Sequence, residues 1–327
     1  MEFCNLGSTG CAISRLGFGC GPASGYDYGP IDKSAWIAAI RAALDSGINF
    51  FDVADVYGFG FVEELLSRAL DERRHEVVIA TKGGLVWDEK GRVSRNSSRK
   101  QITRAIEDSL RRLRVDVISL YQIHWPDPMT HIKETFETLR DFQDQGKIRF
   151  IGVSNFSLEL LQEACRTCRI DSQQVAYNLL CRDVETDILP WCDAKQISVL
   201  AHTGLARGLL AGKRHISSRF GDRDTRTRSP YFSEEGRVEK EQLLGTLSRL
   251  SERTGRSVCS IALRWILDNP KIATVLVGMK DQAQLRENLK AVDWQLDQPD
   301  HEVLLKTSTA CPQGLAGTPA HEAANDR

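Results

Sequence analysis

The sequence predicts an α/β fold, a (β/α)8 TIM barrel, from three observations. Short runs rich in β-formers alternate with longer amphipathic stretches along most of the 327 residues, and eight of these runs are strand candidates. Several of the runs, such as FFDVA, VVIAT and TVLVG, are almost continuously apolar, which is typical of strands covered on both faces. A doubly wound sheet usually has fewer strands and often a second domain, whereas no proline- or glycine-rich linker divides this chain. We therefore expect one barrel over residues 1–306.

Helical stretches lie between the expected strands. In chain order, the expected strands are Leu16–Cys20, Asn49–Ala54, Glu76–Thr81, Val117–His124, Phe150–Asn155, Gln174–Asn178, Ser198–His202 and Thr274–Gly278. The expected helices are Lys33–Ser46, Val62–Arg74, Arg99–Arg114, Ile132–Gln145, Leu158–Arg169 and Asp187–Lys195. The first helix has the clearest end signals, because Asp32 stands at its N-cap position and Gly47 follows its last turn.

Two regions break this repeat. Residues 214–235 form a polar, arginine-rich insertion after the seventh strand. In residues 307–327 the apolar period is lost, and we expect a mobile C-terminal tail there. Neither region contains a strand candidate.

Composition and charge exclude several classes of protein. The formal net charge is -1, which removes the main argument for a nucleic acid or an anionic membrane as a partner. No apolar run approaches the roughly 18 residues of a membrane span. The N-terminus lacks the basic and then apolar layout of a signal peptide. We therefore expect a cytoplasmic protein.

The nine cysteines do not indicate disulfides or a metal site. An odd number of cysteines in a long chain without a secretion signal is typical of reduced cytosolic thiols. Cys165 and Cys168 form a CxxC motif, but this motif lies within a helical pattern and has no second pair or nearby histidine. We expect small, mostly buried side chains at these positions and no metal.

Polar side chains stand at the ends of successive expected strands. The second strand carries Asp52 and runs into Tyr57. The third strand ends at Lys82 and the fourth at His124. Taken alone, Lys82 and Asp52 are also consistent with a structural ion pair, since buried lysine and aspartate are usually paired. Because reactive groups in a barrel of this class gather at the C-terminal strand ends, the four residues together predict a catalytic site.

These four residue types fit the reduction of a carbonyl group. Hydride transfer to a carbonyl builds negative charge on its oxygen, which must be stabilised and then protonated. Tyr57 would supply the proton, but a tyrosine with its ordinary pKa of about 10 is a reluctant donor at neutral pH. The ammonium group of Lys82 would favour the ionised form of Tyr57, and Asp52 would hold this ammonium in place. His124 would hydrogen-bond and orient the carbonyl oxygen, while a cofactor supplies the hydride.

At these residues the chain resembles the aldo-keto reductase superfamily. The stretch GINFFDVADVYGFGFVEELLSRAL is similar to the family's strand-two signature, with Asp52 and Tyr57 at the five-residue separation of the family. VVIATKGG carries Lys82 and LYQIHWPDP carries His124, while KIRFIGVSNFS and QVAYNLLCRDVE continue a match that covers roughly residues 1–295. The resemblance implies that these four residues are the catalytic tetrad. The WPDP stretch and the insertion look more like the bacterial-type and potassium-channel-β-like branches than the vertebrate aldose reductases.

The resemblance also implies a binding site for NADPH or NADP+. Its residues would hold the nicotinamide carboxamide, wrap the pyrophosphate and bind the adenosine end. In chain order, they are Ser154, Asn155, Gln174, His202, Thr203, Leu205, Gly208, Lys213, Gly278, Lys280, Gln284, Glu287 and Asn288. Lys280 places a cation where a 2′-phosphate would lie, which favours NADPH over NADH. Many relatives have a bidentate arginine there, whereas lysine acts as a point charge.

One position departs from the family pattern. Relatives usually have Tyr-Ser-Pro-Leu after the seventh strand, and this tyrosine stacks on the nicotinamide. Here the stretch runs His-Thr-Gly-Leu from His202 to Leu205. An imidazole stacks with less area, and its charge ordinarily changes near neutral pH. If His202 takes the place of the tyrosine, we expect cofactor affinity to weaken as the imidazole becomes protonated beside the positive ring of NADP+.

The sequence says least about the substrate, because variable loops build the substrate pockets of this fold. Four aromatic residues follow strand ends and would either line a pocket for a flat or ring-shaped carbonyl compound or pack at the barrel rim. They are Tyr26, Tyr28, Trp87 and Trp125. The insertion is a solvated loop, a lid over the cofactor phosphates, or a site for an anionic substrate such as a nucleotide-activated keto-sugar.

Two other functions stay open. The chain would oxidise a sugar or an alcohol with NAD(P)+ if the cofactor ratio in the cell favours that direction. It would alternatively bind NADPH as a regulatory subunit with little turnover, as the channel β-subunit relatives do. The complete tetrad favours turnover. Neither the physiological substrate, the direction nor the oligomeric state follows from the sequence.

Overall fold

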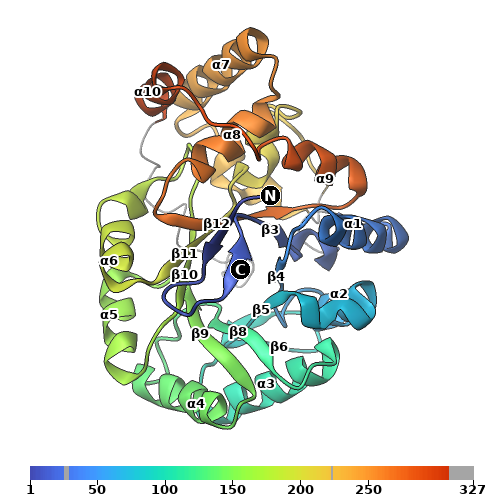
Figure 1. Cartoon of the computed structure of the whole chain (residues 1–327), viewed down its shortest axis with the longest axis vertical. Coiled ribbons are helices and arrows are strands. Elements are labelled where there is room, and N and C mark those ends of the chain that lie inside the picture. Colours follow the sequence, from blue (N-terminus) through green and yellow to red (C-terminus); the bar gives the residue numbers. More distant parts are fainter. Residues whose placement is uncertain (26–28, 222–223, 309–327) are drawn as a thin grey trace.

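The computed structural model describes residues 1–25, 29–221 and 224–308, and it shows a closed barrel of eight strands surrounded by helices (Figure 1). The barrel strands are β3 (Leu16–Gly19), β4 (Phe50–Asp52), β5 (Val78–Gly83), β8 (Ile118–Ile123), β9 (Ile148–Ser154), β10 (Ser172–Ala176), β11 (Ser198–His202) and β12 (Ile272–Gly278). Neighbouring strands are parallel and follow the order β10–β11–β12–β3–β4–β5–β8–β9 around the barrel. The expected (β/α)8 barrel is confirmed, and each expected strand overlaps an observed one.

Helices cover the outside of the barrel. They are α1 (Lys33–Asp45), α2 (Phe61–Leu70), α3 (Arg99–Leu113), α4 (Ile132–Asp144), α5 (Leu158–Thr167), α6 (Ile188–Lys195), α7 (Arg237–Thr254), α8 (Val258–Leu267), α9 (Gln282–Leu289) and α10 (Gln298–Thr307). The first six coincide with expected helices, whereas α7 to α10 were not among those expected. Helix α2 ends at Leu70 instead of Arg74 because the backbone of Asp71 leaves the helical region, with a φ of 50° and a ψ of -128°.

The helices pack on the barrel through one apolar stripe each. In α3 the buried residues are spaced three and four positions apart, as an amphipathic helix requires. They are Ile102, Ala105, Ile106, Ser109 and Leu113. Such stripes join the outward-facing strand residues in one large apolar core between the strands and the helices. The strands are therefore covered on both faces, which accounts for their continuous apolar runs.

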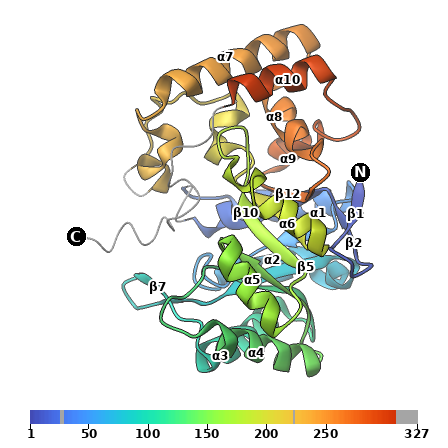
Figure 2. The ribbon, with the colours of Figure 1, turned by 90° about the vertical axis from the view of Figure 1, so that its left-hand side faces the viewer.

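A hairpin closes the N-terminal end of the barrel. It pairs β1 (Phe3–Asn5) with β2 (Ala12–Ser14), and its fully buried Leu6 and Ile13 pack with Phe50, which lies inside the barrel. A second hairpin, of β6 (Leu85–Trp87) and β7 (Val93–Arg95), lies at the opposite end of the molecule (Figure 2). The N-terminal end is thus filled with apolar side chains, and the C-terminal strand ends are left for a site.

The two irregular regions differ from the barrel in their structure. The described residues of the insertion include two short 3-10 turns, Thr225–Arg228 and Pro230–Phe232. The expected mobile tail falls largely on residues 309–327, which lie outside the described residues. Of its first two residues, Thr307 ends α10, and Ser308 is buried and accepts a hydrogen bond from Arg182 at 2.6 Å. Among the helices of the described ranges, none has the length and apolar character that crossing a membrane requires.

Candidate active site

A cavity of about 900 Å³ opens at the C-terminal ends of the barrel strands. Its volume lies in the range of cofactor and substrate sites. Three of the four expected catalytic residues form part of its wall, namely Asp52, Tyr57 and His124, while Lys82 is fully buried behind Asp52. All of the expected cofactor residues line it as well: Ser154, Asn155, Gln174, His202, Thr203, Leu205, Gly208, Lys213, Gly278, Lys280, Gln284, Glu287 and Asn288. The barrel therefore gathers residues from distant parts of the chain around one cavity.

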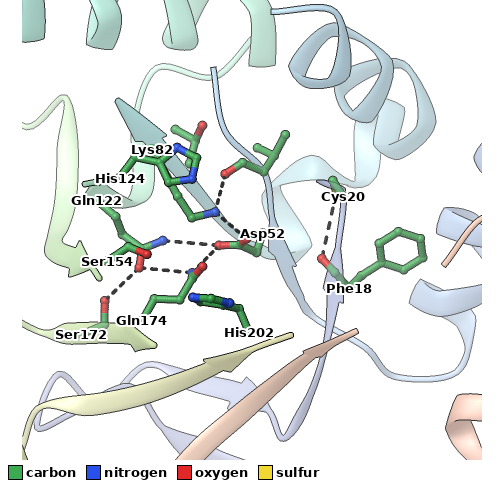
Figure 3. Close-up of polar contacts among 12 residues, drawn as sticks. Phe18, Cys20, Asp52, Lys82, Gln122, His124, Ser154, Ser172, Gln174 and His202 are labelled. Carbon is green, nitrogen blue, oxygen red and sulfur yellow. Dashed lines mark hydrogen bonds and ion pairs between the residues drawn. The ribbon is translucent and has the colours of Figure 1, made fainter. Parts of the chain in front are cut away.

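A buried ion pair lies at the base of the site. Lys82 Nζ, on β5, donates to Asp52 Oδ1 at 2.6 Å and to the carbonyl oxygen of Val53 at 3.1 Å (Figure 3). The exposed fraction is 0% for Lys82 and 4% for Asp52. Removing a charge from water costs roughly several kcal/mol per ion. The attraction within the pair offsets this cost only if hydrogen bonds satisfy the remaining donors and acceptors. The stability of the buried ion pair therefore depends on the hydrogen bonds around it.

Tyr57 and His124 meet beside this pair. Their ring centroids are 5.8 Å apart in an edge-to-face arrangement, and Lys82 Nζ lies 5.3 Å from the centroid of the Tyr57 ring. The turn after β4 sets the position of Tyr57, whose backbone N–H donates to the carbonyl oxygen of Ala54. The backbone of His124 is tied to β5 through a hydrogen bond to Gly83. The rings of Tyr57 and His124 thus meet in the cavity wall, and the buried ammonium of Lys82 lies next to the Tyr57 ring.

Two glutamines hold the second oxygen of Asp52. Gln174 Nε2 donates to Asp52 Oδ2 at 2.8 Å, and Gln122 Nε2 donates to the same oxygen at 3.4 Å (Figure 3). A carboxylate accepts hydrogen bonds only, so each glutamine must turn its NH2 group towards Asp52. The carbonyl oxygen of the Gln174 side chain is then directed away from Asp52, in the wall of the cavity.

A chain of hydrogen bonds joins His202 to the backbone of His124. Asn155 Nδ2 donates to the carbonyl oxygen of His124 at 3.0 Å and to Ser154 Oγ at 2.9 Å. This orientation turns Asn155 Oδ1 towards His202 Nε2, at 3.1 Å. His202 Nε2 must therefore be the donor, and His202 Nδ1 accepts from the Thr203 hydroxyl at 2.7 Å. The contacts select one neutral tautomer of His202.

The expectation that His202 changes its charge near neutral pH is wrong. Burial lowers the pKa of His202 to about 3, and the positive charges of Lys82 and Arg207 act in the same direction. Burial disfavours the charged imidazolium, and nearby cations add repulsion. His202 therefore stays neutral throughout the physiological range.

Cations gather in another part of the cavity wall. It includes Lys213, Arg214, Arg226, Arg228 and Lys280, of which the arginines belong to the insertion. Burial lowers the pKa of Lys280, and the charges of Arg226 and Arg214 lower it further, whereas Asp224 raises it. Arg226 donates to both oxygens of Asp224, at 2.9 and 2.6 Å. Like charges at this density favour the binding of an anionic group.

The loop after β12 is built around its own hydrogen bonds. The backbone N–H of Lys280 donates to Gln284 Oε1 at 2.9 Å, and Asp281 caps α9 by accepting from the backbone N–H of Gln284 at 2.8 Å. Asn288 accepts a hydrogen bond from the buried thiol of Cys259 at 3.3 Å. These contacts fix the loop between β12 and the start of α9, and they join α9 to α8.

The expected substrate residues have different positions. Trp125 lines the cavity with Leu85, and the guanidinium of Arg95 lies 5.4 Å from the centroid of a Trp125 ring. Trp87 packs on Phe59, with ring centroids 5.5 Å apart, and is not among the residues in the cavity wall. Tyr26 and Tyr28 lie outside the described residues.

The CxxC cysteines carry protonated thiols. Burial raises the pKa of Cys165 to about 11 and that of Cys168 to about 12. A thiolate is the form that binds metals and attacks disulfides, so neither chemistry is favoured here. Over the described part of the chain, there is no group of three or more His, Cys, Asp or Glu residues that could hold a metal ion.

Gln122 was not among the expected residues of the site, and the sequence predicts no individual role for Arg226 among the arginines of the insertion. Gln122 stands two positions before His124 in the expected strand Val117–His124, and this period-two spacing, which predicts one face of that strand, was the available signal. Arg226 belongs to the insertion, where several arginines are close in sequence and nothing in the sequence singles one out. Its place in the cavity wall depends on how the insertion folds back.

Known proteins resemble this chain over almost its whole length. The model of the aldo/keto reductase family matches residues 15–307. The chain is 38% identical over 320 residues to the aldo-keto reductase YhdN of Bacillus subtilis (strain 168), covering 96% of each protein. It is 31% identical over 323 residues to the NADH-specific methylglyoxal reductase of Escherichia coli (strain K12), covering 93% of this chain and 98% of the relative. The structure of the glycerol dehydrogenase AKR11B4 from Gluconobacter oxydans superposes with a TM-score of 0.86 at 36% identity, covering 94% of each chain.

Proposed function

This chain belongs to the aldo/keto reductase family of oxidoreductases, and we propose that it reduces an aldehyde or a ketone with NADPH, with Tyr57 as the general acid. One observation carries the proposal. Tyr57 and His124 meet in the wall of the cavity, and the buried ion pair of Lys82 and Asp52 lies against Tyr57. A proton donor and a second hydrogen-bonding group therefore share one part of a cavity that is large enough for a cofactor and a substrate.

The residues of the cavity fit a nicotinamide dinucleotide. Asn155 and Gln174 supply amide groups for a carboxamide, and Gln174 has its Nε2 committed to Asp52, so its Oε1 is the atom that accepts from an NH2 group. Lys213 and Lys280 supply cations for phosphates in the same wall. When bound, the dinucleotide supplies the hydride.

The residues of the chain handle the proton and the developing charge. Tyr57 donates its hydroxyl proton to the carbonyl oxygen as negative charge builds there. His124 hydrogen-bonds the same oxygen and orients it. Lys82, held by Asp52 at 2.6 Å, stabilises the tyrosinate that is left behind. No other side-chain proton needs to move during the reduction.

The preference for NADPH over NADH rests on the cationic wall. Lys280 lies near Arg226 and Arg214, as their effect on its pKa indicates, and a 2′-phosphate would bring two further negative charges to these three cations. The methylglyoxal reductase relative is NADH-specific by its name, so family membership alone does not determine the preference. The insertion then acts as part of the cofactor site, as a lid that carries Arg214 and Arg226.

The substrate side of the cavity is apolar and aromatic. Leu85, Tyr57 and Trp125 line it, which suits a small carbonyl compound with an apolar or ring-shaped part. The name of the Escherichia coli relative makes methylglyoxal one substrate to test. A second candidate is the oxidation of a polyol with NADP+, which the glycerol dehydrogenase relative favours. The same residues serve both directions, because Tyr57 then accepts the proton that it otherwise donates.

The decisive experiment compares the wild type with Tyr57→Phe. The compounds are methylglyoxal, other aldehydes, quinone-like ketones, keto-sugars and pyridoxal with NADPH, and glycerol with NADP+, and the absorbance of the reduced cofactor is followed. We expect Tyr57→Phe to lower kcat by roughly 10²–10⁴-fold, because it removes the proton donor and leaves the ring. The dissociation constant of NADPH should change by less than about threefold.

Tyr121→Phe is the matched control. Tyr121 is buried on β8, and its hydroxyl has no hydrogen-bond partner among the described residues. Its loss should leave kcat unchanged. A wild type no faster than Tyr57→Phe on every compound would overturn the proposal and favour a cofactor-binding protein with little turnover.

A further inference from the structure

Three neighbouring barrel strands carry Gln122, Gly152 and Ser172 at one level. Gln122 on β8 pairs with Gly152 on β9, and Gly152 pairs with Ser172 on β10. A Cβ at residue 152 would lie 2.2 Å from Ser172 Oγ and 3.0 Å from Gln122 Cγ. Glycine in the middle strand therefore leaves the space in which the two polar side chains meet. Ser172 Oγ donates to Gln122 Oε1 across this gap, at 3.5 Å.

The other end of the Gln122 amide reaches the ion pair. Gln122 Nε2 donates to Asp52 Oδ2 at 3.4 Å, while Lys82 holds Asp52 Oδ1 at 2.6 Å (Figure 3). Gln122 and Lys82 are also partners in the register of β5 and β8. Gln122 and Ser172 are both fully buried. In such surroundings a polar group needs a partner for each donor and acceptor, so the amide of Gln122 is held from both ends.

We propose that Gln122 is a positioning residue for the proposed reaction, on which the inference rests: it fixes the Asp52 carboxylate so that Lys82 stays against Tyr57. Without Gln122, the described donors to Asp52 Oδ2 are reduced to Gln174, at 2.8 Å. With one hydrogen-bond donor fewer, more of the negative charge of Asp52 remains uncompensated, and this charge acts more strongly on the ammonium of Lys82. The ammonium stabilises the tyrosinate less, and Tyr57 is deprotonated only at a higher pH.

Other titratable groups face the ion pair from the neighbouring strands. They are Cys20 after β3, Asp55 after β4, His124 after β8 and His202 on β11. Burial and the nearby carboxylate raise the pKa of Cys20 well above its ordinary value, and the pKa of His202 is lowered to about 3 by burial. All four groups are the same in every variant below, so a difference between variants reports the change at Gln122.

The test uses two substitutions at residue 122 and one matched control. Gln122→Met keeps the length of the side chain and removes the donor, whereas Gln122→Glu adds a carboxyl group beside Asp52. The control is Gln173→Met, because Gln173 is an equally buried glutamine on β10 that donates to the carbonyl oxygen of Phe156 at 2.7 Å. If replacing any buried glutamine by methionine lowers stability or activity, Gln173→Met shows the same loss.

Steady-state kinetics supply the first readout. We expect Gln122→Met to lower kcat about tenfold, to leave the KM of the carbonyl substrate within about threefold, and to raise the alkaline limb of the pH–kcat profile by about half a unit or more. Gln122→Glu should raise the limb further through its added negative charge. Gln173→Met should leave the limb in place.

A readout without turnover supplies the second. The near-ultraviolet absorbance of tyrosinate, titrated in each protein and in the same protein carrying Tyr57→Phe, isolates Tyr57 by difference. The titration of Tyr57 in Gln122→Met should shift upward by the same amount as the alkaline limb of the pH–kcat profile.

If both the alkaline limb and the Tyr57 titration of Gln122→Met coincide with those of the wild type, Gln122 has a structural role only and the inference is wrong. If the wild type reduces no carbonyl compound, the proposed function fails, but the titration still tests the inference. Gln122→Asn, which keeps a shorter amide, takes the place of Gln122→Met if the latter does not fold.

Discussion

At the scale of single residues, the site depends on buried charged side chains whose donors and acceptors are satisfied by hydrogen bonds within the protein. Lys82 is fully buried and donates to Asp52 and to the carbonyl oxygen of Val53. The second oxygen of Asp52 receives Gln174 and Gln122. A buried ion pair whose partners are incomplete loses more in desolvation than it gains in attraction. The hydrogen bonds from Gln174 and Gln122 to Asp52 therefore help to stabilise the charged form of Lys82 beside Tyr57.

His202 shows the same principle acting on a neutral group. The family resemblance predicts that it takes the place of a stacking tyrosine, and its hydrogen bonds to Thr203 and Asn155 select the tautomer that donates from Nε2. Burial and the cations Lys82 and Arg207 lower its pKa to about 3. An imidazole at this position thus behaves as a neutral aromatic ring with a donor and an acceptor.

The first prediction concerns the pH dependence of cofactor binding at His202. A group with a pKa of about 3 is less than about 1% protonated at pH 5.5, so no charge appears between about pH 5.5 and 8. We expect the ratio of the NADP+ dissociation constants of His202→Phe and the wild type to be constant over this range. Fluorescence titrations at several pH values measure it.

The titration of the 2′-phosphate of NADP+ changes both dissociation constants equally, so its effect cancels in their ratio. A ratio that falls by more than about threefold towards acid pH would show that His202 takes up a proton in this range. Below about pH 4 the ratio should fall, because the wild type alone then gains a positive charge beside the positive nicotinamide ring.

At the scale of the elements, the packing between strands and helices depends on side chains of limited size. Gly83 ends β5 directly after Lys82, and Tyr121 on β8 lies against it beneath α3. A Cβ at residue 83 would lie 2.0 Å from the hydroxyl oxygen of Tyr121 and 3.3 Å from the Cβ of Ala105 in α3. The end of β5, which carries the proposed catalytic Lys82, can therefore approach α3 only if residue 83 is glycine.

The second prediction tests this contact with a double-mutant cycle. Gly83→Ala should lower the free energy of unfolding by about 1–3 kcal/mol, because the new methyl group cannot be accommodated without moving β5 or α3. Tyr121→Phe alone should change it by less than about 1 kcal/mol, since the hydroxyl has no hydrogen-bond partner among the described residues. The double variant should recover much of the loss. Urea denaturation measures all four proteins, and strictly additive effects would rule out the contact.

At the scale of the whole molecule, closing the barrel brings distant segments to one cavity. The strands β12 and β3 pair across most of the length of the chain, and β10 pairs with β9 to complete the ring. The insertion then lies beside the loop after β12, so that Arg214 and Arg226 affect the pKa of Lys280. The cationic wall is therefore a product of the closed barrel and of no single segment.

The third prediction is the contribution of this wall to cofactor preference. Lys280→Ala and Arg226→Ala should each weaken NADPH about tenfold or more, because hydrogen bonds to charged groups contribute about 1.5–3 kcal/mol. NADH lacks the 2′-phosphate, so its dissociation constant should change by less than about threefold. Protein fluorescence quenching measures both constants. Lys133→Ala removes an exposed lysine of α4 and controls for net charge. An equal loss for NADPH and NADH would contradict the assignment of the 2′-phosphate to these residues.

Much of the fold and of the site could be predicted from the sequence, because these features depend on local patterns. Period-two and apolar runs mark the barrel strands, and a residue at a strand end such as Lys82 lies at the end of the barrel where sites form. The four helices after the insertion were missed, although α8 is almost continuously apolar between Val258 and Leu267. A short apolar run alone does not distinguish a buried helix from a strand.

The amino-acid sequence was sufficient for the barrel and for the meeting of the polar strand-end residues at one cavity, since strand ends of a parallel barrel lie on one face whatever the loops do. The resemblance to a known family, and not strand-end geometry, predicted the thirteen cofactor residues, and their role stays a prediction. The sequence was not sufficient for the charge state of His202, the link from Gln122 to Asp52 or the place of Arg226 beside Lys280. The position of Trp87 outside the cavity wall, against Phe59, also needed the three-dimensional structure. Burial and through-space contacts set each of these properties, and the groups concerned stand tens of residues apart in the chain.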